Sequence, residues 1–142
     1  ERMSHVSVPP DVKLERTALV PVPLSRNRLR ERGFNQSEVI AAALAKFWRI
    51  PVWAGALSRQ TSTRSQTQLT PGERLGNVAG AFSVPAAQCA ILKGAHLVLV
   101  DDVVTTGATL RASASALFAA GARTISYMTF GRAPASGDRL FP

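Results

Sequence analysis

One stretch of the 142-residue chain decides its fold class: Leu97-Val98-Leu99-Val100-Asp101-Asp102-Val103-Val104-Thr105-Thr106-Gly107-Ala108-Thr109. It starts with an aliphatic run, which is typical of a strand in a parallel sheet that is buried on both faces. Two carboxylates follow, at the strand end where α/β sheets bind their ligands. A hydroxyl-rich turn, in which Gly107 allows a tight bend, then leads directly into a helix. The stretch therefore predicts a ligand site at the carboxyl end of a strand.

The turn itself predicts phosphate binding. Its free backbone N–H groups and the dipole of the following helix converge on one point, where an anion is stabilised. The hydroxyls of Thr105, Thr106 and Thr109 add further donors. Carboxylates are poor neighbours for a phosphate, so we expect Asp101 and Asp102 to contact vicinal hydroxyls or a Mg²⁺ ion on the same ligand. A phosphorylated sugar presents both kinds of group.

A purely structural interpretation of these residues is that Asp and Thr only cap the helix. Capping requires one such residue, whereas six of the nine positions from 101 to 109 are polar or glycine. The sequence contains neither of the other common phosphate signatures, GxxxxGK[ST] and GxGxxG. Phosphate binding by this turn is therefore the stronger interpretation.

The rest of the chain predicts strands that alternate with helices. We expect strands at 18–22, 52–57, 78–84, 96–101 and 123–130. A helix should follow Asn35, with Glu38 completing a capping box, and end before Pro51. A second helix should run over 110–120, where Gly121 takes a left-handed cap conformation. Residues 24–33 should form a basic loop, and 85–95 a connection. This order predicts an α/β fold with a mostly parallel sheet.

The domain organisation follows from composition. We expect an irregular N-terminal arm at 1–17, one domain at 18–132 and a polar tail at 133–142. Within the domain, residues 59–77 contain only two large apolar side chains, Leu69 and Leu75. This segment therefore predicts a long mobile loop, and its Arg, Gln and Thr content suits a lid that closes over a phosphate.

The charge balance predicts an anionic partner. Seventeen Lys and Arg against nine Asp and Glu give a net charge of +8. These arginines could simply be solvated surface residues without a binding role. Four of them cluster within seven residues, however, which favours a function: Arg26, Arg28, Arg30 and Arg32. We expect all four to rim the carboxyl edge of the sheet. Weak, non-specific binding of single-stranded DNA is expected on charge alone, because no groove-reading motif or aromatic series is present.

Several classes are excluded or disfavoured by the sequence. The single cysteine, Cys89, excludes a disulfide framework and a multi-cysteine zinc site within these residues, and is expected to be a small core residue. His96 opens a buried strand and is expected to be a hydrogen-bonded structural histidine. No apolar run approaches the roughly 20 residues that span a bilayer, and no signal peptide is recognisable. We expect a cytoplasmic protein without membrane contact, and leave a homodimer open.

The stretch at 97–109 resembles the phosphoribosyl pyrophosphate (PRPP) motif of type I phosphoribosyltransferases. Further segments are similar to the ComF/GntX-type branch of that family, over roughly 18–132: Val20-Pro-Val-Pro-Leu24, Arg28-Leu-Arg-Glu-Arg-Gly-Phe-Asn-Gln36, Arg59 to Asn77, and Gly80-Ala-Phe82. The resemblance implies a type I phosphoribosyltransferase-like fold with a flexible loop over the site. Members of the branch usually carry an N-terminal four-cysteine zinc module and a further helix. Neither is present here, so we expect the catalytic-type domain alone or a shortened relative.

The resemblance also implies a role for each matching residue. Asp101 and Asp102 would hold the ribose hydroxyls and a Mg²⁺ ion, directly or through water or substrate. The 5′-phosphate would be held by Thr105, Thr106, Gly107, Ala108 and Thr109. The pyrophosphate loop would comprise Leu24, Ser25, Arg26 and Arg32, and the flexible loop would contribute Arg59, Arg64, Gln68 and Arg74.

Two functions of different classes stay open at this point. One is a Mg²⁺-dependent phosphoribosyltransferase that transfers a phosphoribosyl group to an unidentified acceptor and releases pyrophosphate. The other is a non-catalytic module that binds PRPP or phosphate and serves DNA uptake or nucleic-acid handling. The PRPP motif favours the enzyme, while the positive charge is compatible with both.

Overall fold

The computed structural model describes residues 17–60, 80–104 and 106–132. Except for Thr17, the predicted arm at 1–17 and tail at 133–142 lie outside these residues, as do 61–79. The elements are β1 (Ala18–Pro21), α2 (Arg26–Arg32), α3 (Gln36–Trp48), η2 (Ala54–Ala56), β2 (Ser58–Arg59), β3 (Phe82–Ser83), η4 (Ala86–Gln88), α5 (Cys89–Leu92), β4 (His96–Val104), α6 (Ala108–Ala119) and β5 (Thr124–Arg132).

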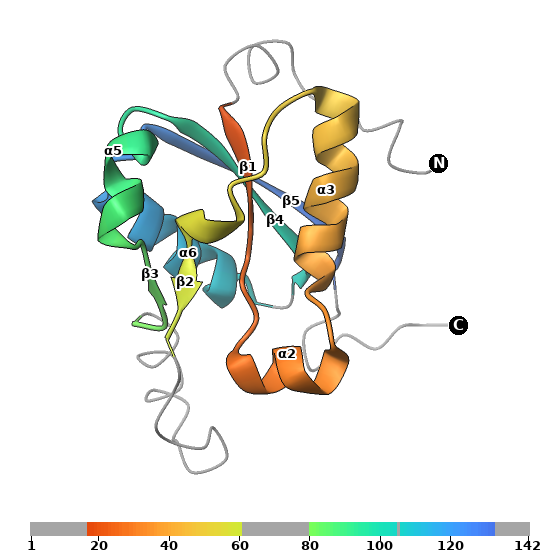
Figure 1. Cartoon of the computed structure of the whole chain (residues 1–142). Helices are drawn as coiled ribbons and strands as arrows, with labels where there is room; N and C mark the ends of the chain where they lie inside the picture. Colours follow the sequence, from red (N-terminus) through yellow and green to blue (C-terminus); the bar gives the residue numbers. More distant parts are fainter. Residues whose placement is uncertain (1–16, 61–79, 105, 133–142) are drawn as a thin grey trace.

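The main sheet is parallel, with strand order β1-β4-β5. Val52 adds an isolated parallel bridge to Leu19 on β1, and β2 and β3 form a separate antiparallel pair. The predicted α/β fold with a mostly parallel sheet is therefore confirmed. Because the three strands run the same way, their carboxyl ends meet at one edge. Helix α2 lies at this edge, at the bottom of Figure 1.

Helices cover both faces of the sheet. On one face α3 packs against β1 and β4, through Leu19, Ile40, Ala41, Leu44, Val98 and Val100. On the other face, α6 and the β2–β3 pair enclose a core that includes Val20, Leu97, Leu99, Leu110 and Leu117. Successive residues of β4 thus enter opposite cores, as the two-residue period of a strand requires. Truncating fully buried Leu97 or Leu99 to alanine should cost about 2–5 kcal/mol of stability.

The prediction of a basic loop at 24–33 is wrong, because most of it is helix α2. Ser25 caps the helix by accepting from the Arg28 N–H at 3.4 Å, and Gly33 ends it in the left-handed conformation at φ 77°. No residue of α2 is buried. Hydrophobic periodicity marks only a helix with an apolar face, so this exposed helix gave no such signal.

Helix α3 confirms the prediction behind Asn35, with one difference at its start. The Asn35 side chain accepts from the Ser37 N–H at 3.0 Å, rather than from Glu38 as a capping box requires. Helix α6 begins at Ala108, two residues before the predicted start. Gly121 has the predicted positive φ, 109°, and follows the cap residue Ala120.

The second predicted strand, 52–57, is wrong. Only Val52 pairs with the sheet, and η2 follows at once. The residues that follow have neither β-branched nor aromatic side chains, which are the types that favour strands: Ala54, Gly55 and Ala56. This explains why no strand forms at 54–56. Of the predicted strand at 78–84, Phe82 and Ser83 form β3, while 78 and 79 lie outside the described residues.

Strand β4 is three residues longer than predicted, so Asp101 and Asp102 lie within the strand and before its last paired residues, Val103 and Val104. Strand β5 likewise reaches Arg132. His96 has the predicted structural role, with its Nε2 atom 2.9 Å from the Ser126 hydroxyl. Cys89 is half-buried at the surface rather than a core residue.

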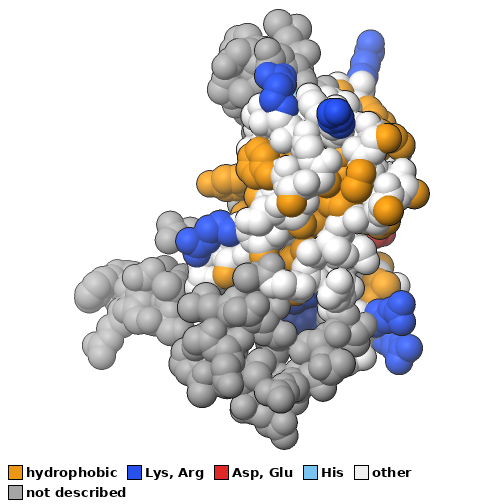
Figure 2. Space-filling model, turned by 90° about the vertical axis from the view of Figure 1, so that its left-hand side faces the viewer, with side chains coloured by type: hydrophobic (Ala, Val, Ile, Leu, Met, Phe, Trp, Pro, Cys, Tyr) orange, Lys and Arg blue, Asp and Glu red, His pale blue; other side chains and the backbone are white. Residues whose placement is uncertain are grey.

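The face that carries α5 and α6 is poor in charge. In Figure 2 hydrophobic side chains run across its middle, and lysine and arginine side chains lie toward its ends. Ile91 and Phe118 are among the exposed large hydrophobic residues. Among the described helices none is long and apolar enough to cross a membrane.

Candidate functional site

The two acidic residues near the end of β4 are each fixed by the backbone that follows them. Asp101 Oδ1 accepts from the Asp102 N–H at 2.9 Å, and Asp102 Oδ1 accepts from the Val103 N–H at 2.8 Å. A carboxylate held at one oxygen has fewer orientations to lose when the other oxygen binds a ligand. The arrangement is therefore preorganised for a partner at the Oδ2 atoms.

A residue from α3, Ser37, adds a second donor to this pair. Its hydroxyl donates to Asp101 Oδ1 at 3.3 Å. Within the described residues, Asp102 Oδ2 lies 3.9 Å from the Arg32 guanidinium, and the side chains of Asp101 and Asp102 also interact with each other. Sequence reasoning missed Ser37, although it follows directly on the segment 28–36 that carried the family resemblance.

Burial changes the acidity of one carboxyl. It raises the pKa of Asp101 from its ordinary 3.8 to about 6, and the negative charge of Asp102 acts in the same direction. The hydrogen bonds from the Asp102 N–H and Ser37 oppose that rise. A carboxylate whose charge is disfavoured in the free protein gains most from an added cation or hydroxyl donor.

The first turn of α6 lies beyond the end of β4. Gly107 caps the helix at φ 80° and provides no side-chain acceptor, while the Ala108 N–H reaches the Thr106 hydroxyl at 3.3 Å. A Cβ at Gly107 would meet no atom within 4 Å, so glycine is required here for its backbone conformation. Thr106, Gly107, Ala108 and Thr109 are thus placed on a helix start, where anions bind. Thr105 lies outside the described residues.

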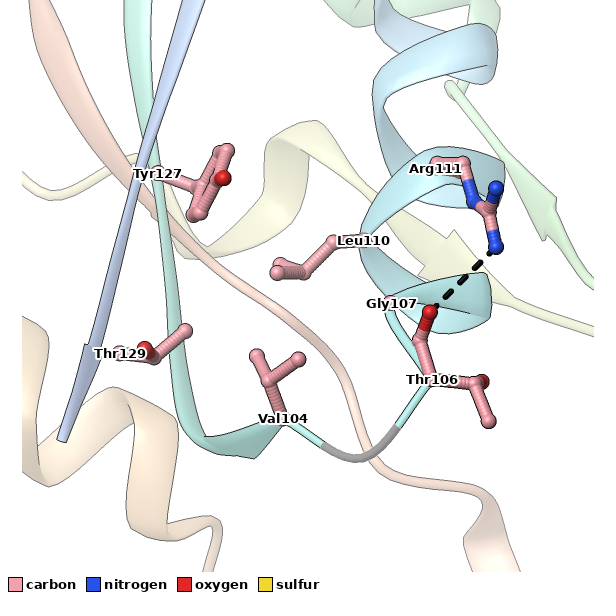
Figure 3. Close-up of a pocket in the computed structure, with 7 residues that line it drawn as sticks. All are labelled: Val104, Thr106, Gly107, Leu110, Arg111, Tyr127 and Thr129. Atoms are coloured by element: carbon pink, nitrogen blue, oxygen red, sulfur yellow. Dashed lines mark hydrogen bonds between the residues drawn. The ribbon is translucent and has the colours of Figure 1, made fainter. Parts of the chain in front are cut away.

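A cavity of about 400 Å³ opens beside this turn (Figure 3). Its wall comprises Val104, Thr106, Gly107, Leu110, Arg111, Tyr127 and Thr129. The Arg111 guanidinium donates to the Thr106 carbonyl at 3.3 Å, and Tyr127 approaches from β5 on the opposite side (Figure 3). The size suits a small organic molecule. Of these residues, the sequence analysis had singled out only Thr106 and Gly107.

The four arginines of α2 lie at the predicted edge of the sheet, but they do not share one side of the helix. Residues four apart share a side of a helix, whereas residues two apart point about 200° apart. Arg28 and Arg32 thus share one side, and Arg32 on that side pairs with Asp102. Arg26 and Arg30 share the other side, and within the described residues neither forms a salt bridge.

Arg59 connects β2 to the same site. Its guanidinium lies 5.3 Å from the centre of the Phe82 ring. Burial lowers the pKa of Arg59, nearby Arg28 lowers it further, and Asp101 raises it. The Arg59 guanidinium is stacked on the Phe82 ring and lies near Arg28 and Asp101, so it is well placed to bind a negative ligand. The other predicted lid residues, Arg64, Gln68 and Arg74, lie outside the described residues.

The carboxylates fit a Mg²⁺ ion of the kind that binds together with a phosphorylated substrate. Such an ion typically takes one or two carboxylates and keeps phosphate and water as its remaining ligands. Asp101 and Asp102 supply two neighbouring carboxylates, and the second oxygen of Asp102 is held only by a 3.9 Å ion pair to Arg32. No cluster of three or more His, Cys, Asp or Glu occurs within the described residues, so a cage made by protein alone is not what this part of the chain offers.

The sequence comparison decides the family. Residues 33–139 match the phosphoribosyl transferase domain. The chain belongs to this family. The PRPP motif at 97–109 lies within the matched residues, as does the Asn35–Ser37 turn that contacts it.

Competence and DNA utilization proteins are among the relatives of this phosphoribosyltransferase domain. The chain is 35% identical over 107 residues to the DNA utilization protein YhgH of Escherichia coli K12, covering 75% of this chain and 45% of that protein. It is 32% identical over 116 residues to competence protein F of Haemophilus influenzae, covering 82% and 50%. Competence protein ComFC of Bacillus subtilis is 32% identical over 103 residues, covering 72% and 39%. The chain thus spans half the length of these relatives or less.

A solved structure has the same fold. Glutamine PRPP amidotransferase from B. subtilis, complexed with ADP and GMP, superposes with a TM-score of 0.54 and 22% identity, covering 84% of this chain and 24% of that one. The predicted phosphoribosyltransferase-like fold and the ComF-type resemblance are both confirmed.

Proposed function

We propose that this phosphoribosyltransferase domain binds PRPP with Mg²⁺ and transfers the phosphoribosyl group to an unidentified acceptor, releasing pyrophosphate. One observation carries the proposal. Asp101 and Asp102 are each fixed at Oδ1 by backbone hydrogen bonds at 2.8 to 2.9 Å, and Asp102 Oδ2 is held only by a 3.9 Å ion pair, beside a helix start that suits phosphate. Membership of the family supports the same ligand.

In this proposal the chain binds, orients and stabilises, and supplies no nucleophile. The first turn of α6 holds the 5′-phosphate, and the two carboxylates accept from ribose hydroxyls. The bond between C1 and the pyrophosphate oxygen breaks as a bond from C1 to the acceptor forms, and the acceptor's proton leaves to solvent. Positive charge develops on the ribose, and fixed carboxylates beside it lower the barrier.

Arginines of α2 and β2 complete the site in this proposal. Arg32 pairs with Asp102, and Arg59 lies within electrostatic reach of both Asp101 and Arg28. They would bind the pyrophosphate as its negative charge increases on departure. Asp101 and Asp102 would hold the Mg²⁺ ion, which when bound neutralises part of that charge. Of the predicted pyrophosphate loop, Ser25 already caps α2, so its contribution is indirect.

The test is release of pyrophosphate from PRPP with Mg²⁺ over a panel of bases and other nucleophiles. We expect release with at least one acceptor, and its loss in the variant with Asp101→Asn and Asp102→Asn. The Ser126→Ala variant, at the far end of the sheet, is the matched control and should release pyrophosphate as the parent does. PRPP binding without turnover for any acceptor would contradict transfer and select the second function.

The second candidate is a non-catalytic PRPP-binding module for nucleic-acid handling, and the α2 arginines favour it. Arg26 and Arg30 are exposed, lie by helical spacing on the side of α2 away from Arg32, and form no salt bridge within the described residues. Two such cations are free to contact a phosphate backbone. The names of the relatives, DNA utilization and competence proteins, support a setting that involves DNA.

Salt titration of single-stranded DNA binding tests this second candidate. The logarithm of the binding constant should fall by about 0.7 per phosphate neutralised for each tenfold rise in salt. We expect weak binding that PRPP does not compete away, because the helical spacing puts Arg26 and Arg30 on the side of α2 opposite to Arg32, which pairs with Asp102. Full competition by PRPP would contradict that separation, and no binding at low salt would remove the candidate.

A further inference from the structure

A closed series of hydrogen bonds joins the end of β1 to the acidic pair. The Val22 N–H donates to the Val100 carbonyl at 2.9 Å, and the Val22 carbonyl accepts from Asn35 Nδ2 at 3.0 Å. Asn35 Oδ1 accepts from the Ser37 N–H at 3.0 Å, and the Ser37 hydroxyl donates to Asp101 Oδ1 at 3.3 Å. Asp101 is the chain neighbour of Val100, so the series returns to where it began.

The two polar side chains in this series are almost fully buried. Asn35 is 5% exposed and Ser37 is 3% exposed. Burial of an amide and a hydroxyl is costly unless each group is hydrogen-bonded. Asn35 meets that requirement with two bonds, one to the Val22 carbonyl and one that caps α3. Ser37 meets it with its bond to Asp101, which means that the hydroxyl and the carboxylate hold each other in place.

We propose that Ser37, oriented by Asn35, is a positioning residue that fixes the Asp101 carboxylate for the ribose hydroxyls of PRPP. This inference rests on the proposed function and adds a residue to it. Asp101 Oδ1 receives two donors, from the Asp102 N–H and the Ser37 hydroxyl, and these set the plane of the carboxylate. The other oxygen is thereby held for the ligand.

Loss of the Ser37 hydroxyl should lower the affinity for a ligand that contains ribose, but not for one that lacks it. Ser37→Ala leaves Asp101 with one fixed donor, so the carboxylate rotates more freely. We expect affinity for PRPP to fall on the order of tenfold, as for loss of a hydrogen bond to a charged group. Affinity for inorganic pyrophosphate without Mg²⁺, which has no ribose and needs no metal held by Asp101, should stay within about twofold of the parent. A merely structural role would weaken both ligands alike.

The experiment is titration calorimetry of PRPP with Mg²⁺, and of pyrophosphate without it, on the parent chain, on Ser37→Ala and on three further variants. Ser37→Thr keeps the hydroxyl and should recover most of the PRPP affinity. Ser37→Cys keeps the size with a weak donor and should behave as Ser37→Ala does. Ser126→Ala is the matched control, since its hydroxyl also contacts one side chain, His96, but at the opposite end of β4. Thermal unfolding of every variant confirms that it is folded.

The outcomes separate this inference from the proposed function. A parent that binds PRPP, with an unchanged affinity in folded Ser37→Ala, would overturn the role of Ser37 and leave the proposed function standing. An equal loss for PRPP and pyrophosphate would also overturn it. A parent that binds no PRPP would overturn the proposed function, and this inference with it. If Ser37→Ala does not fold, Ser37→Cys and Ser37→Thr decide between the same outcomes.

Discussion

The acidic pair on β4 and the arginines on α2 lie at the same edge of the sheet but are held in opposite ways. Asp101 and Asp102 sit on a strand that pairs on both sides, and hydrogen bonds shorter than 3 Å fix one oxygen of each. Helix α2 buries no residue, and its contact to the pair is one ion pair at 3.9 Å. The Arg32–Asp102 ion pair is largely exposed, and at 3.9 Å its atoms are far apart, so it contributes little to stability.

This difference separates two tasks at one site. A rigid strand suits the part of a ligand that must be oriented, such as the ribose and its reacting carbon. A surface helix with long arginine side chains suits a group that gains charge and then leaves. We therefore expect substitutions on β4 to affect ligand geometry strongly, and substitutions on α2 to change affinity in proportion to charge.

The largest effect should follow from replacing both Asp101 and Asp102 with Asn. Each loses a charge-assisted hydrogen bond to the ligand, worth about 1.5–3 kcal/mol, so Mg²⁺-dependent PRPP binding should fall more than a hundredfold. The fold should survive, since removing two neighbouring negative charges relieves repulsion. Calorimetry on a variant with a native circular dichroism spectrum gives the answer. Unchanged affinity would show that the pair is not the ribose site.

A smaller loss is expected from Gly107→Val on the phosphate side of the site. A left-handed φ of 80° costs an ordinary L-residue roughly 1–2 kcal/mol, and more for a branched one. Because a Cβ has free space there, the cost comes from the backbone and not from a clash. Gly107→Asn should therefore retain most ribose 5-phosphate binding, while Gly107→Val loses about tenfold. The measurement is competition of ribose 5-phosphate against PRPP. If ribose 5-phosphate competes equally well in the parent and in both variants, the 5′-phosphate does not bind at Gly107.

The two sides of α2 should respond differently to loss of charge. Arg28→Gln with Arg32→Gln should lower pyrophosphate affinity several-fold, because these arginines neighbour Arg59 and Asp102. Arg26→Gln with Arg30→Gln removes the same charge from the other side, and should leave pyrophosphate binding unchanged. Filter binding of single-stranded DNA should show the reverse ranking. If both double variants act alike on both ligands, only net charge matters and the sides of the helix do not.

How far the sequence predicted these regions depends on whether local residues determine them. The aliphatic run of β4, its acidic end and Gly107 are local signals, so the strand, the turn and the start of α6 could be predicted closely. The error of three residues at the end of β4 arose because pairing with β5 continues past the carboxylates. No local pattern records how far a neighbouring strand extends.

The contacts between distant segments could not be predicted in this way. Ser37 and Asp101 are separated by 64 positions, and their contact depends on how α3 packs over β4. Helix α2 lacks an apolar face, so its arginines were predicted as one loop cluster instead of two opposite pairs. Tyr127 and Arg111 line one cavity only because β5 returns beside α6.

The last prediction concerns pH and the carboxylate that Ser37 holds. Burial raises the pKa of Asp101 to about 6 in the folded chain, against about 3.8 when it is exposed. Between these values the folded chain binds more protons than the unfolded chain. The contribution of Asp101 to stability is therefore most favourable below about pH 4 and declines as pH rises through 6.

Asp101→Asn removes this titration and so should remove that decline. The difference in unfolding free energy between Asp101→Asn and the parent, from urea titrations at pH 4 to 8, should increase in favour of the variant up to about pH 6 and then level off. Groups that titrate alike in both proteins cancel in that difference. Unliganded protein is the right sample, because phosphate groups of PRPP also titrate near pH 6. A difference that stays flat across the range would mean that Asp101 is as exposed and as acidic as an ordinary surface carboxyl, and that its rigid environment on β4 does not alter its charge.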